Sequence, residues 1–413
     1  MAVSGLSLRA GMTRSWAALP SWAKIAAVYA LARLVTVALV LLAAQLAPAQ
    51  SQLGSLNPLG DFTLAWDAQW YWLVAVEGYP DELPVDENGH VIQNAWAFLP
   101  VYAYAAKAVG AVFGGNWAVG AFVVSFVAGY LACLGLCAII RIRQGRAQAM
   151  WAVAFFAFGP LAALFHVGYA ESLFLAELFA ALLCVLKRRW WWLYLLVPLM
   201  AFTRPGLQAF ALMLAMYGIW RWFTRGRDPL PARDVVHIVV IGLFAAAAGF
   251  AWPAIAGVVT GDPGAYLDTE LAWRRGWVGT EEFAPVEGWF AAADVWFAVW
   301  GLPAGMAPVA VVALVAALTA LVLFLPAVRR VGPELRMWAA SYLIYLLLVF
   351  FPQSSIFRLM VPLAPAMAGA AVLPGSGRRA RLVRAGVMVV CLAGQWAWIW
   401  FMWARGSDYW QVP

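Results

Sequence analysis

Long apolar runs recur along almost the whole chain, from Trp22 to Trp403. Many approach the roughly 20 residues that an α-helix needs to cross a hydrocarbon core of about 30 Å. Only helices and closed barrels satisfy their backbone hydrogen bonds in that core. Hydrophobic residues make up 65% of the sequence and charged residues 11%, which excludes an ordinary water-soluble fold. We therefore predict one all-α, polytopic membrane domain over residues 1–413.

Basic residues gather in short clusters between the apolar runs. The clusters lie at 9–24, 141–146, 187–189, 221–233, 329–336 and 378–384. Because basic loops stay on the cytoplasmic side, the runs between two clusters must cross the membrane in pairs. This rule predicts about eleven spans, a cytoplasmic N-terminus and an external C-terminus. The predicted spans are 22–47, 117–140, 147–166, 170–186, 190–204, 206–223, 235–259, 302–326, 337–351, 358–373 and 385–403.

These spans leave a long first external loop at 48–116. Residues 96–113 are apolar enough to cross, but that crossing would move Arg141 and every later basic cluster to the wrong side. We therefore predict an interfacial helix there, with Lys107 towards water and the aromatic side chains towards lipid. A second amphipathic stretch at about 64–77 gives the loop two juxtamembrane helices.

The charge distribution and the absence of certain motifs exclude several classes of function. The formal net charge of +7 comes from the basic clusters. It therefore indicates which loops lie in the cytoplasm and does not indicate nucleic-acid binding. The sequence lacks a phosphate-binding glycine loop and a close aspartate pair for a nucleotide-sugar metal, so a transferred group must come from a donor already activated in the membrane. We expect no metal, no cofactor and no disulfide. Scarce lysine beside abundant arginine, alanine and tryptophan is typical of a GC-rich bacterial gene, which favours a bacterial plasma membrane.

The first external loop holds an acidic residue among aromatic ones. Asp67 lies in WDAQWYW, at the start of a helix-like run. The helix dipole favours a carboxylate there, which we expect to be ionised at neutral pH. Aromatic rings beside a carboxylate also suit a sugar, so we predict sugar or acceptor contacts for Trp66, Gln69, Trp70 and Tyr71. The alternative is a helix-capping aspartate within an aromatic interface belt.

Further ionisable residues lie inside or at the edge of the spans. The segment FHVGYAES places His166, Tyr169 and Glu171 at the external boundary of the fourth span. Charge at that depth is costly and usually faces a cavity or a partner. We interpret the three as candidate sugar- or acceptor-binding residues, with a local ion pair as the alternative for His166 and Glu171. The deeper Glu177 is predicted to be structural and to pair with Arg33.

Two arginines are candidate phosphate ligands. The fifth span, of about 15 residues, rises only roughly 22 Å, so Arg204 at its end should lie below the external surface. Pro205 and Gly206 break the helix next to it, and such a break is tolerated where it lines a polar cavity. A guanidinium can donate two hydrogen bonds to phosphate. Arg358, at the external start of the tenth span, is the second candidate. The alternatives are a structural role for Arg204 and a headgroup-level anchor for Arg358.

The second external loop, at about 260–300, contains LAWRRGW. Its Arg274 and Arg275 lie between tryptophans and are candidate contacts for the acceptor or for an anionic lipid headgroup. Simple anchoring at the membrane surface explains the same pattern.

Five segments resemble bacterial relatives of the PIG-V family in their order and approximate spacing: WDAQWYWLVAVEGY, FLPVYAY, YAESLFLAELFAAL, TRPGL and RLMVPLAP. That family contains the mannosyltransferase that adds the second mannose in GPI-anchor synthesis. It belongs to the GT-C glycosyltransferases, multi-helix enzymes that use polyprenyl-phosphate sugars outside the cytoplasm or in the ER lumen. The resemblance covers roughly residues 20–370. This chain has TRPGL where relatives often have TRPTG.

The resemblance implies a GT-C-type fold, a catalytic base at Asp67 and active-site roles for Glu171 and Arg204. It implies inverting transfer of mannose from a polyprenyl-phosphate donor to a glycolipid or glycan acceptor at the external face, with membrane lipids around the enzyme. One alternative is the same chemistry with glucose or arabinofuranose. Another is a lipid or solute transporter with Arg204 and Glu171 along its path, although the sequence shows none of the repeats typical of transporters.

Overall fold

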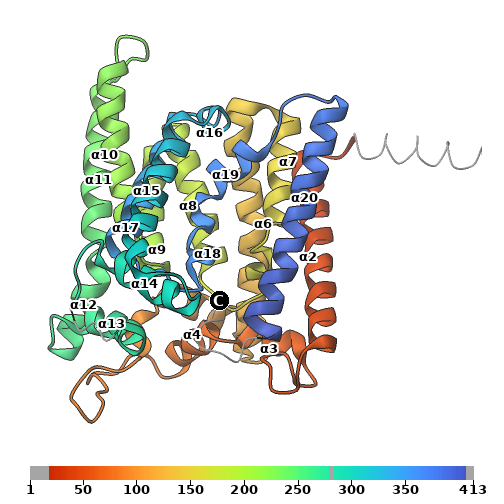
Figure 1. Ribbon diagram of the computed structural model, residues 1–413. Coiled ribbons are helices and arrows are strands. Elements are labelled where there is room, and N and C mark those ends of the chain that lie inside the picture. Colours follow the sequence, from red (N-terminus) through yellow and green to blue (C-terminus); the bar gives the residue numbers. More distant parts are fainter. Residues whose placement is uncertain (1–17, 279–281, 406–413) are drawn as a thin grey trace, which may run out of the picture.

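The computed structural model describes residues 18–278 and 282–405, which fold into helices joined by turns and loops (Figure 1). Within those ranges the one β pairing is an isolated bridge between Val85 and Val91. The all-α prediction is confirmed. The α-helices are α2 (Ser21–Leu46), α3 (Pro58–Leu64), α4 (Asp67–Val76), α5 (Pro100–Ala111), α6 (Trp117–Gln144), α7 (Arg146–Ala157), α8 (Glu171–Leu186), α9 (Leu193–Thr203), α10 (Leu207–Thr224), α11 (Ala232–Ala248), α12 (Ala251–Thr260), α13 (Ala265–Val278), α14 (Glu287–Val299), α15 (Ala307–Phe324), α16 (Pro326–Arg329), α17 (Pro333–Val349), α18 (Ile356–Leu359), α19 (Ala364–Ala371) and α20 (Arg378–Ile399).

Five stretches of the described chain are long and apolar enough to cross a membrane. They are α2, α6, the α11–α12 stretch, α15, and α20 with the π-helical turn that follows it. Together with the all-helical fold, they mark an integral membrane protein. The total of about eleven crossings stays a prediction, since helices such as α9, with 11 residues, are shorter than a perpendicular crossing requires.

Two predicted spans are interrupted. Region 147–166 forms α7 and then a separate 3-10 turn, because Gly159 and Pro160 follow the helix and proline has no backbone donor. Region 358–373 is divided among α18, a 3-10 turn and α19, with Pro362 and Pro365 at the two later starts. The prediction of a continuous helix is wrong for both regions.

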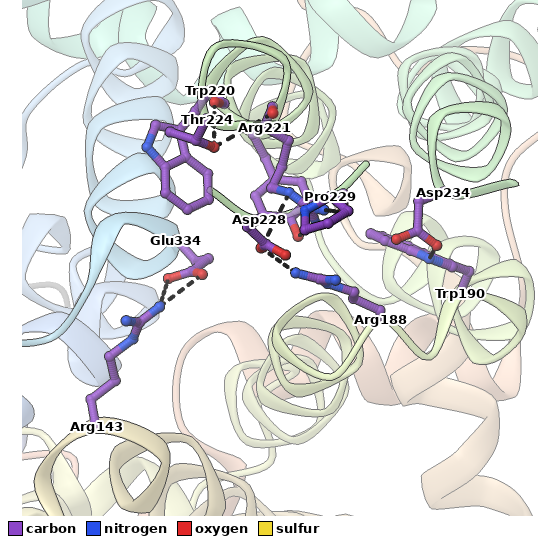
Figure 2. Close-up of polar contacts among 11 residues, drawn as sticks. Arg143, Arg188, Trp190, Trp220, Arg221, Thr224, Asp228, Pro229, Asp234 and Glu334 are labelled. Carbon is purple, nitrogen blue, oxygen red and sulfur yellow. Dashed lines mark hydrogen bonds and ion pairs between the residues drawn. The ribbon is translucent and has the colours of Figure 1, made fainter. Parts of the chain in front are cut away.

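The basic loops gather at one end of the bundle. Figure 1 shows the α10–α11 loop, α16 and the start of α20 at the same end, opposite α3, α4, α12 and α13. Figure 2 shows that Arg143 at the end of α6 reaches Glu334 on α17, at 2.9 Å, and that Arg188 pairs with Asp228. We call this end, with Arg143, Arg188, Arg221, Asp228 and Glu334, the basic end. Its cytoplasmic orientation remains a prediction from the charge rule. Arg9, Arg14 and residues 279–281 of the second external loop lie outside the described residues.

The first external loop contains α3, α4 and α5. With 12 residues, α5 rises about 18 Å, too little to cross the hydrocarbon core, which agrees with the predicted interfacial position. The exposed Lys107 donates to the carbonyl oxygen of Ala75 at 2.5 Å. Tyr102, however, is buried, and its hydroxyl lies 2.8 Å from that of Ser125 on α6. The expectation that the aromatic residues face lipid is therefore wrong for Tyr102, because a buried tyrosine hydroxyl needs a partner that lipid does not supply.

Arg33 and Glu177 have separate partners. The buried Arg33 donates to the carbonyl oxygens of Ala157, at 2.5 Å, and Ala162. Ala157 is the last residue of α7, where a carbonyl lacks a helical partner, and Ala162 begins the 3-10 turn that follows. Glu177 accepts a hydrogen bond from the Thr203 hydroxyl at 3.1 Å. The predicted pair between Arg33 and Glu177 is wrong, since backbone acceptors satisfy the arginine.

Candidate active site

Asp67 is the first residue of α4, as the sequence predicts. The preceding Trp66 has φ 55° and ψ −122°, a backbone conformation that side chains other than glycine rarely adopt. This residue turns the chain sharply between α3 and α4. Its indole nitrogen donates to the carbonyl oxygen of Met402 at 3.3 Å, which ties the turn to the C-terminal end of the chain. The turn therefore gives the Asp67 side chain its direction.

Four charged side chains from distant segments meet beside α4. Arg358 pairs with Asp67 and also donates to Glu171 at 3.3 Å. Arg204 lies 2.6 Å from the same Glu171 oxygen. Their side chains are only 4–18% exposed. We call these residues the charged quartet; it unites the catalytic candidate, both phosphate candidates and Glu171, and its formal charges cancel.

Local backbone breaks place the two arginines. Arg204 follows the end of α9 in an extended conformation, and Gly206 has φ 119°, which suits glycine. The predicted break after the short span is thus present. Arg358 lies on the single turn of α18, where its guanidinium carbon is 5.2 Å from the centre of the Tyr169 ring. Tyr169 is fully buried, and it contributes to the site by packing its ring against the Arg358 guanidinium.

Glu171 is the first residue of α8, where the helix dipole favours a negative charge. It is 4% exposed and contacts both arginines. A buried carboxylate is stable only when it is paired, and here it is paired twice. The two roles considered for Glu171, a local ion pair and a binding residue, are therefore compatible, because its ion pairs form part of the site.

Burial raises the pKa of Asp67, although the Arg358 guanidinium counteracts this effect. The negative Glu171 nearby raises the pKa further. The helix dipole alone, which favours an ordinary ionised carboxylate, is therefore an incomplete account of this residue. A carboxylate with a raised pKa is a stronger base, which is what proton removal from a hydroxyl requires.

The aromatic neighbours of Asp67 form a separate wall. Trp70 stacks on Phe98, with ring centres 5.6 Å apart and planes 6° apart, and meets Trp273 of α13 edge-on at 5.7 Å. Tyr71 is buried and contacts Phe98 and Tyr102 through ring edges, both at 5.2 Å. Trp70 and Trp273 thus join the first and second external loops.

Gln69 is exposed and lies away from this wall. It lines an open cleft of about 400 Å³ beside the polar residues Ser51, Gln52, Ser55 and Asp61. It is two positions after Asp67 on α4, so the two side chains leave the helix in nearly opposite directions. The predicted sugar contact of Gln69 would therefore belong to a different surface.

Three other candidates do not join the charged quartet. His166 is buried beside the rings of Phe122 and Phe126, at 5.7 and 6.4 Å, and lines a separate apolar cavity of about 100 Å³. Arg274 donates to the carbonyl oxygen of Val349 at 2.7 Å, and Arg275 to that of Val91 at 2.8 Å. Both arginines brace α13 against neighbouring segments. Their surroundings differ from the open surface that binding of a lipid headgroup would need.

Several polar residues around the quartet are not among those predicted from the sequence. On α13, the Tyr266 hydroxyl hydrogen-bonds to Glu270, and Glu270 interacts electrostatically with Arg274 and Asp67. On α17, the rings of Tyr342 and Tyr345 lie beside Gly206. The signal for the first group is the spacing of four residues between Tyr266, Glu270 and Arg274, which puts them on one helix face.

No model of a protein family matches the chain, and no curated protein matches it. Solved structures that resemble it include the archaeal oligosaccharyltransferase AglB from Archaeoglobus fulgidus, in complex with an inhibitory peptide and a dolichol-phosphate. Identity there is 14%, coverage is 93% of this chain and 56% of that one, and the TM-score is 0.50. The Archaeoglobus fulgidus enzyme tethered to an acceptor peptide through a disulfide gives 13% identity, the same coverages and a TM-score of 0.50. The chain thus spans about half the length of these proteins. At such identity the likeness concerns the fold, and it confirms the predicted GT-C-type fold.

Proposed function

We propose that the chain is an inverting glycosyltransferase that moves mannose from a polyprenyl-phosphate donor to a glycolipid or glycan at the external membrane face. The observation that carries the proposal is the charged quartet, in which two carboxylates meet two arginines from distant segments. The PIG-V-like motifs support it, because they contribute Asp67, Glu171 and Arg204. The oligosaccharyltransferase-like fold supports the use of a lipid-linked donor.

In this mechanism Asp67 accepts the proton of an acceptor hydroxyl while the hydroxyl oxygen attacks the anomeric carbon. The bond between that carbon and the phosphate oxygen breaks, and the electron pair leaves with the polyprenyl phosphate. Arg204 and Arg358 stabilise the charge that develops on the phosphate. Because attack and departure occur on opposite faces of the sugar, the anomeric configuration inverts.

The ion pairs within the quartet suggest how donor binding activates the base. Without the donor, Arg358 is shared between Asp67 and Glu171. A donor phosphate that binds Arg358 draws this arginine away from Asp67. The pKa of Asp67 then rises, and its carboxylate becomes a stronger base. Glu171 keeps both arginines in place during this exchange. Proton removal is thereby linked to the presence of the leaving group.

The identity of the sugar rests on the resemblance to PIG-V relatives, and glucose and arabinofuranose are the alternatives. The external location of the charged quartet is inferred from the charge rule. If the basic end faces the cytoplasm, the quartet lies on the opposite side of the membrane. We further propose that no metal takes part, because two arginines already face the position of the phosphate.

The test uses the purified full-length protein in detergent, with a panel of short-chain polyprenyl-phosphate sugars and a membrane glycolipid extract. We expect release of polyprenyl phosphate with transfer of mannose to the extract, in the presence of EDTA as well, and a rate at least about 10²-fold lower with the Asp67→Asn variant. Preferred transfer of another sugar would correct the donor. Absence of transfer with every donor, together with a lipid or solute flux that depends on Arg204, would overturn the proposal in favour of a transporter.

A further inference from the structure

Helix α13 of the second external loop is fixed against the elements that carry the site. Thr269 accepts a hydrogen bond from Asn94 of the first external loop at 2.9 Å. Arg275 reaches Val91 in the same loop, and Arg274 reaches Val349 at the end of α17. These three attachments give α13 a defined position beside α4 and α17.

The side of α13 that carries Glu270 lies against the side of α4 that carries Asp67, because Trp273, three residues after Glu270, contacts Trp70, three residues after Asp67. Tyr266, Glu270 and Arg274 share this face, and the Tyr266 hydroxyl bonds to the Glu270 carboxylate. Glu270 interacts electrostatically with Asp67, and Tyr345 of α17 interacts with Glu270 and with Arg204. Burial raises the pKa of Glu270, opposed by Arg274. The second external loop thus supplies a second carboxylate that interacts electrostatically with Asp67.

The chemistry of this second carboxylate differs from that of the donor position. An ionised carboxylate accepts hydrogen bonds and repels anions, so Glu270 is unsuited to a phosphate or an anionic headgroup. It suits a partner rich in hydroxyl groups. The neighbouring Trp70 and Trp273 meet at 5.7 Å and offer an apolar surface of the kind that packs against a sugar ring.

We propose that Glu270, together with the Trp70–Trp273 pair, forms the acceptor subsite and binds the hydroxyl groups of a neutral sugar ring. Asp67 then removes the proton of the reacting hydroxyl, while Glu270 holds other hydroxyls of the same ring. Tyr266 orients Glu270 through its hydrogen bond. This inference rests on the proposed glycosyltransferase function and adds to it the class of acceptor.

The test measures transfer to two acceptor probes at a saturating polyprenyl-phosphate sugar: octyl mannoside, which is neutral, and phosphatidylinositol, which is anionic. For Glu270→Gln we expect the KM for octyl mannoside to rise about 10-fold or more, the effect of losing a hydrogen bond to a charged group. The KM for the donor should stay within twofold. Tyr266→Phe should raise the acceptor KM to a smaller extent. The matched control is Asp268→Asn, on the opposite side of α13, which should leave both values unchanged.

Each outcome decides between the two proposals. If wild type transfers sugar and folded Glu270→Gln keeps its acceptor KM, or loses affinity for donor instead, the acceptor subsite is refuted and the glycosyltransferase stands. Preference for phosphatidylinositol over octyl mannoside would refute a neutral acceptor. If Glu270→Gln does not fold, Tyr266→Phe decides by the same comparison. If wild type transfers no sugar from any donor, both proposals fall together.

Discussion

The two ends of the bundle both hold arginine–carboxylate networks, but they hold them at different depths. At the basic end, Arg188 pairs with Asp228 (Figure 2). Their side chains are 39% and 42% exposed. At the opposite end, Glu171 and Arg204 of the charged quartet are 4% and 11% exposed. Exposed pairs add about 0–1 kcal/mol to stability, whereas buried pairs often add nothing once desolvation is counted. Charged residues that are buried without a gain in folding stability indicate a role in function.

Arg221 shows that burial alone is not the criterion. It is fully buried at the basic end, yet it donates to the Tyr217 hydroxyl at 3.0 Å and the Pro229 carbonyl at 2.8 Å. Both partners lie within eight residues of it in the chain, so this arginine closes the α10–α11 loop. The arginines of the quartet instead join segments that are far apart in sequence. The distance along the chain to its partners therefore distinguishes Arg221 from the arginines of the quartet, whereas burial does not.

The comparison is tested most strongly by removing one carboxylate from each end. Asp67→Asn should lower the transfer rate by about 10²- to 10⁴-fold, the usual contribution of a general base. Asp228→Asn removes a carboxylate that also pairs with arginine and should leave the rate within twofold. Both rates are measured with purified protein at equal folded concentration. Equal losses in the two variants would erase the distinction between the ends.

Buried arginines provide the second contrast. Arg204→Gln should reduce transfer by about 10²-fold or more, because the developing charge on the phosphate loses a preorganised donor. Arg221→Gln should leave the turnover of folded protein unchanged and destabilise the fold by about 1–3 kcal/mol, since local acceptors lose their donor. Turnover and thermal unfolding in detergent are measured together. A stability loss without an activity loss in Arg204→Gln would contradict its assignment.

The pH dependence sharpens the account of the quartet. Asp67 acts as a base only when ionised, so the rate is present above its pKa and is lost as the pH falls through it. Since the pKa of Asp67 is already raised, Arg358→Gln should raise it further and move the acidic limb of the rate profile upward by about one pH unit or more. Arg143→Gln, at the basic end, serves as the control with an unmoved limb. A downward shift in Arg358→Gln would exclude this coupling.

The smallest effect is expected from the Arg143–Glu334 pair at the basic end. Arg143 is 41% exposed, so Arg143→Gln should cost about 0–1 kcal/mol of stability and leave transfer unaltered. Thermal unfolding and the transfer assay check this together. A large loss of activity would show that the basic end communicates with the quartet.

Features that depend on local pattern could be predicted from the sequence. Asp67 begins a helix because it precedes an unbroken run of helix-compatible residues. Arg204 ends one because Pro205 and Gly206 follow it. The grouping of the basic loops at one end follows from apolar runs that alternate with arginine clusters.

Features that depend on which face of a helix meets which neighbour could not be predicted. Arg33 takes its partners from the end of α7 and from the 3-10 turn that follows, and the sequence does not show that α7 ends so early. His166 lies close to Glu171 in the chain but faces a different cavity. Glu270 reaches the surroundings of Asp67 only because α13 folds back over the first external loop, about 200 residues earlier in the chain.

The torsion at Trp66 bears on how this protein could evolve. A residue other than glycine in such a conformation costs about 1–3 kcal/mol, and the surrounding structure must hold it in place. Selection for heat tolerance would favour sequences that relax this corner. Selection for turnover would oppose such sequences, because a relaxed backbone at Trp66 would let the Asp67 side chain adopt other positions. Heat-adapted relatives are therefore expected to reinforce the contacts around the corner, such as the indole bond to the C-terminal segment, and to leave the corner itself bent.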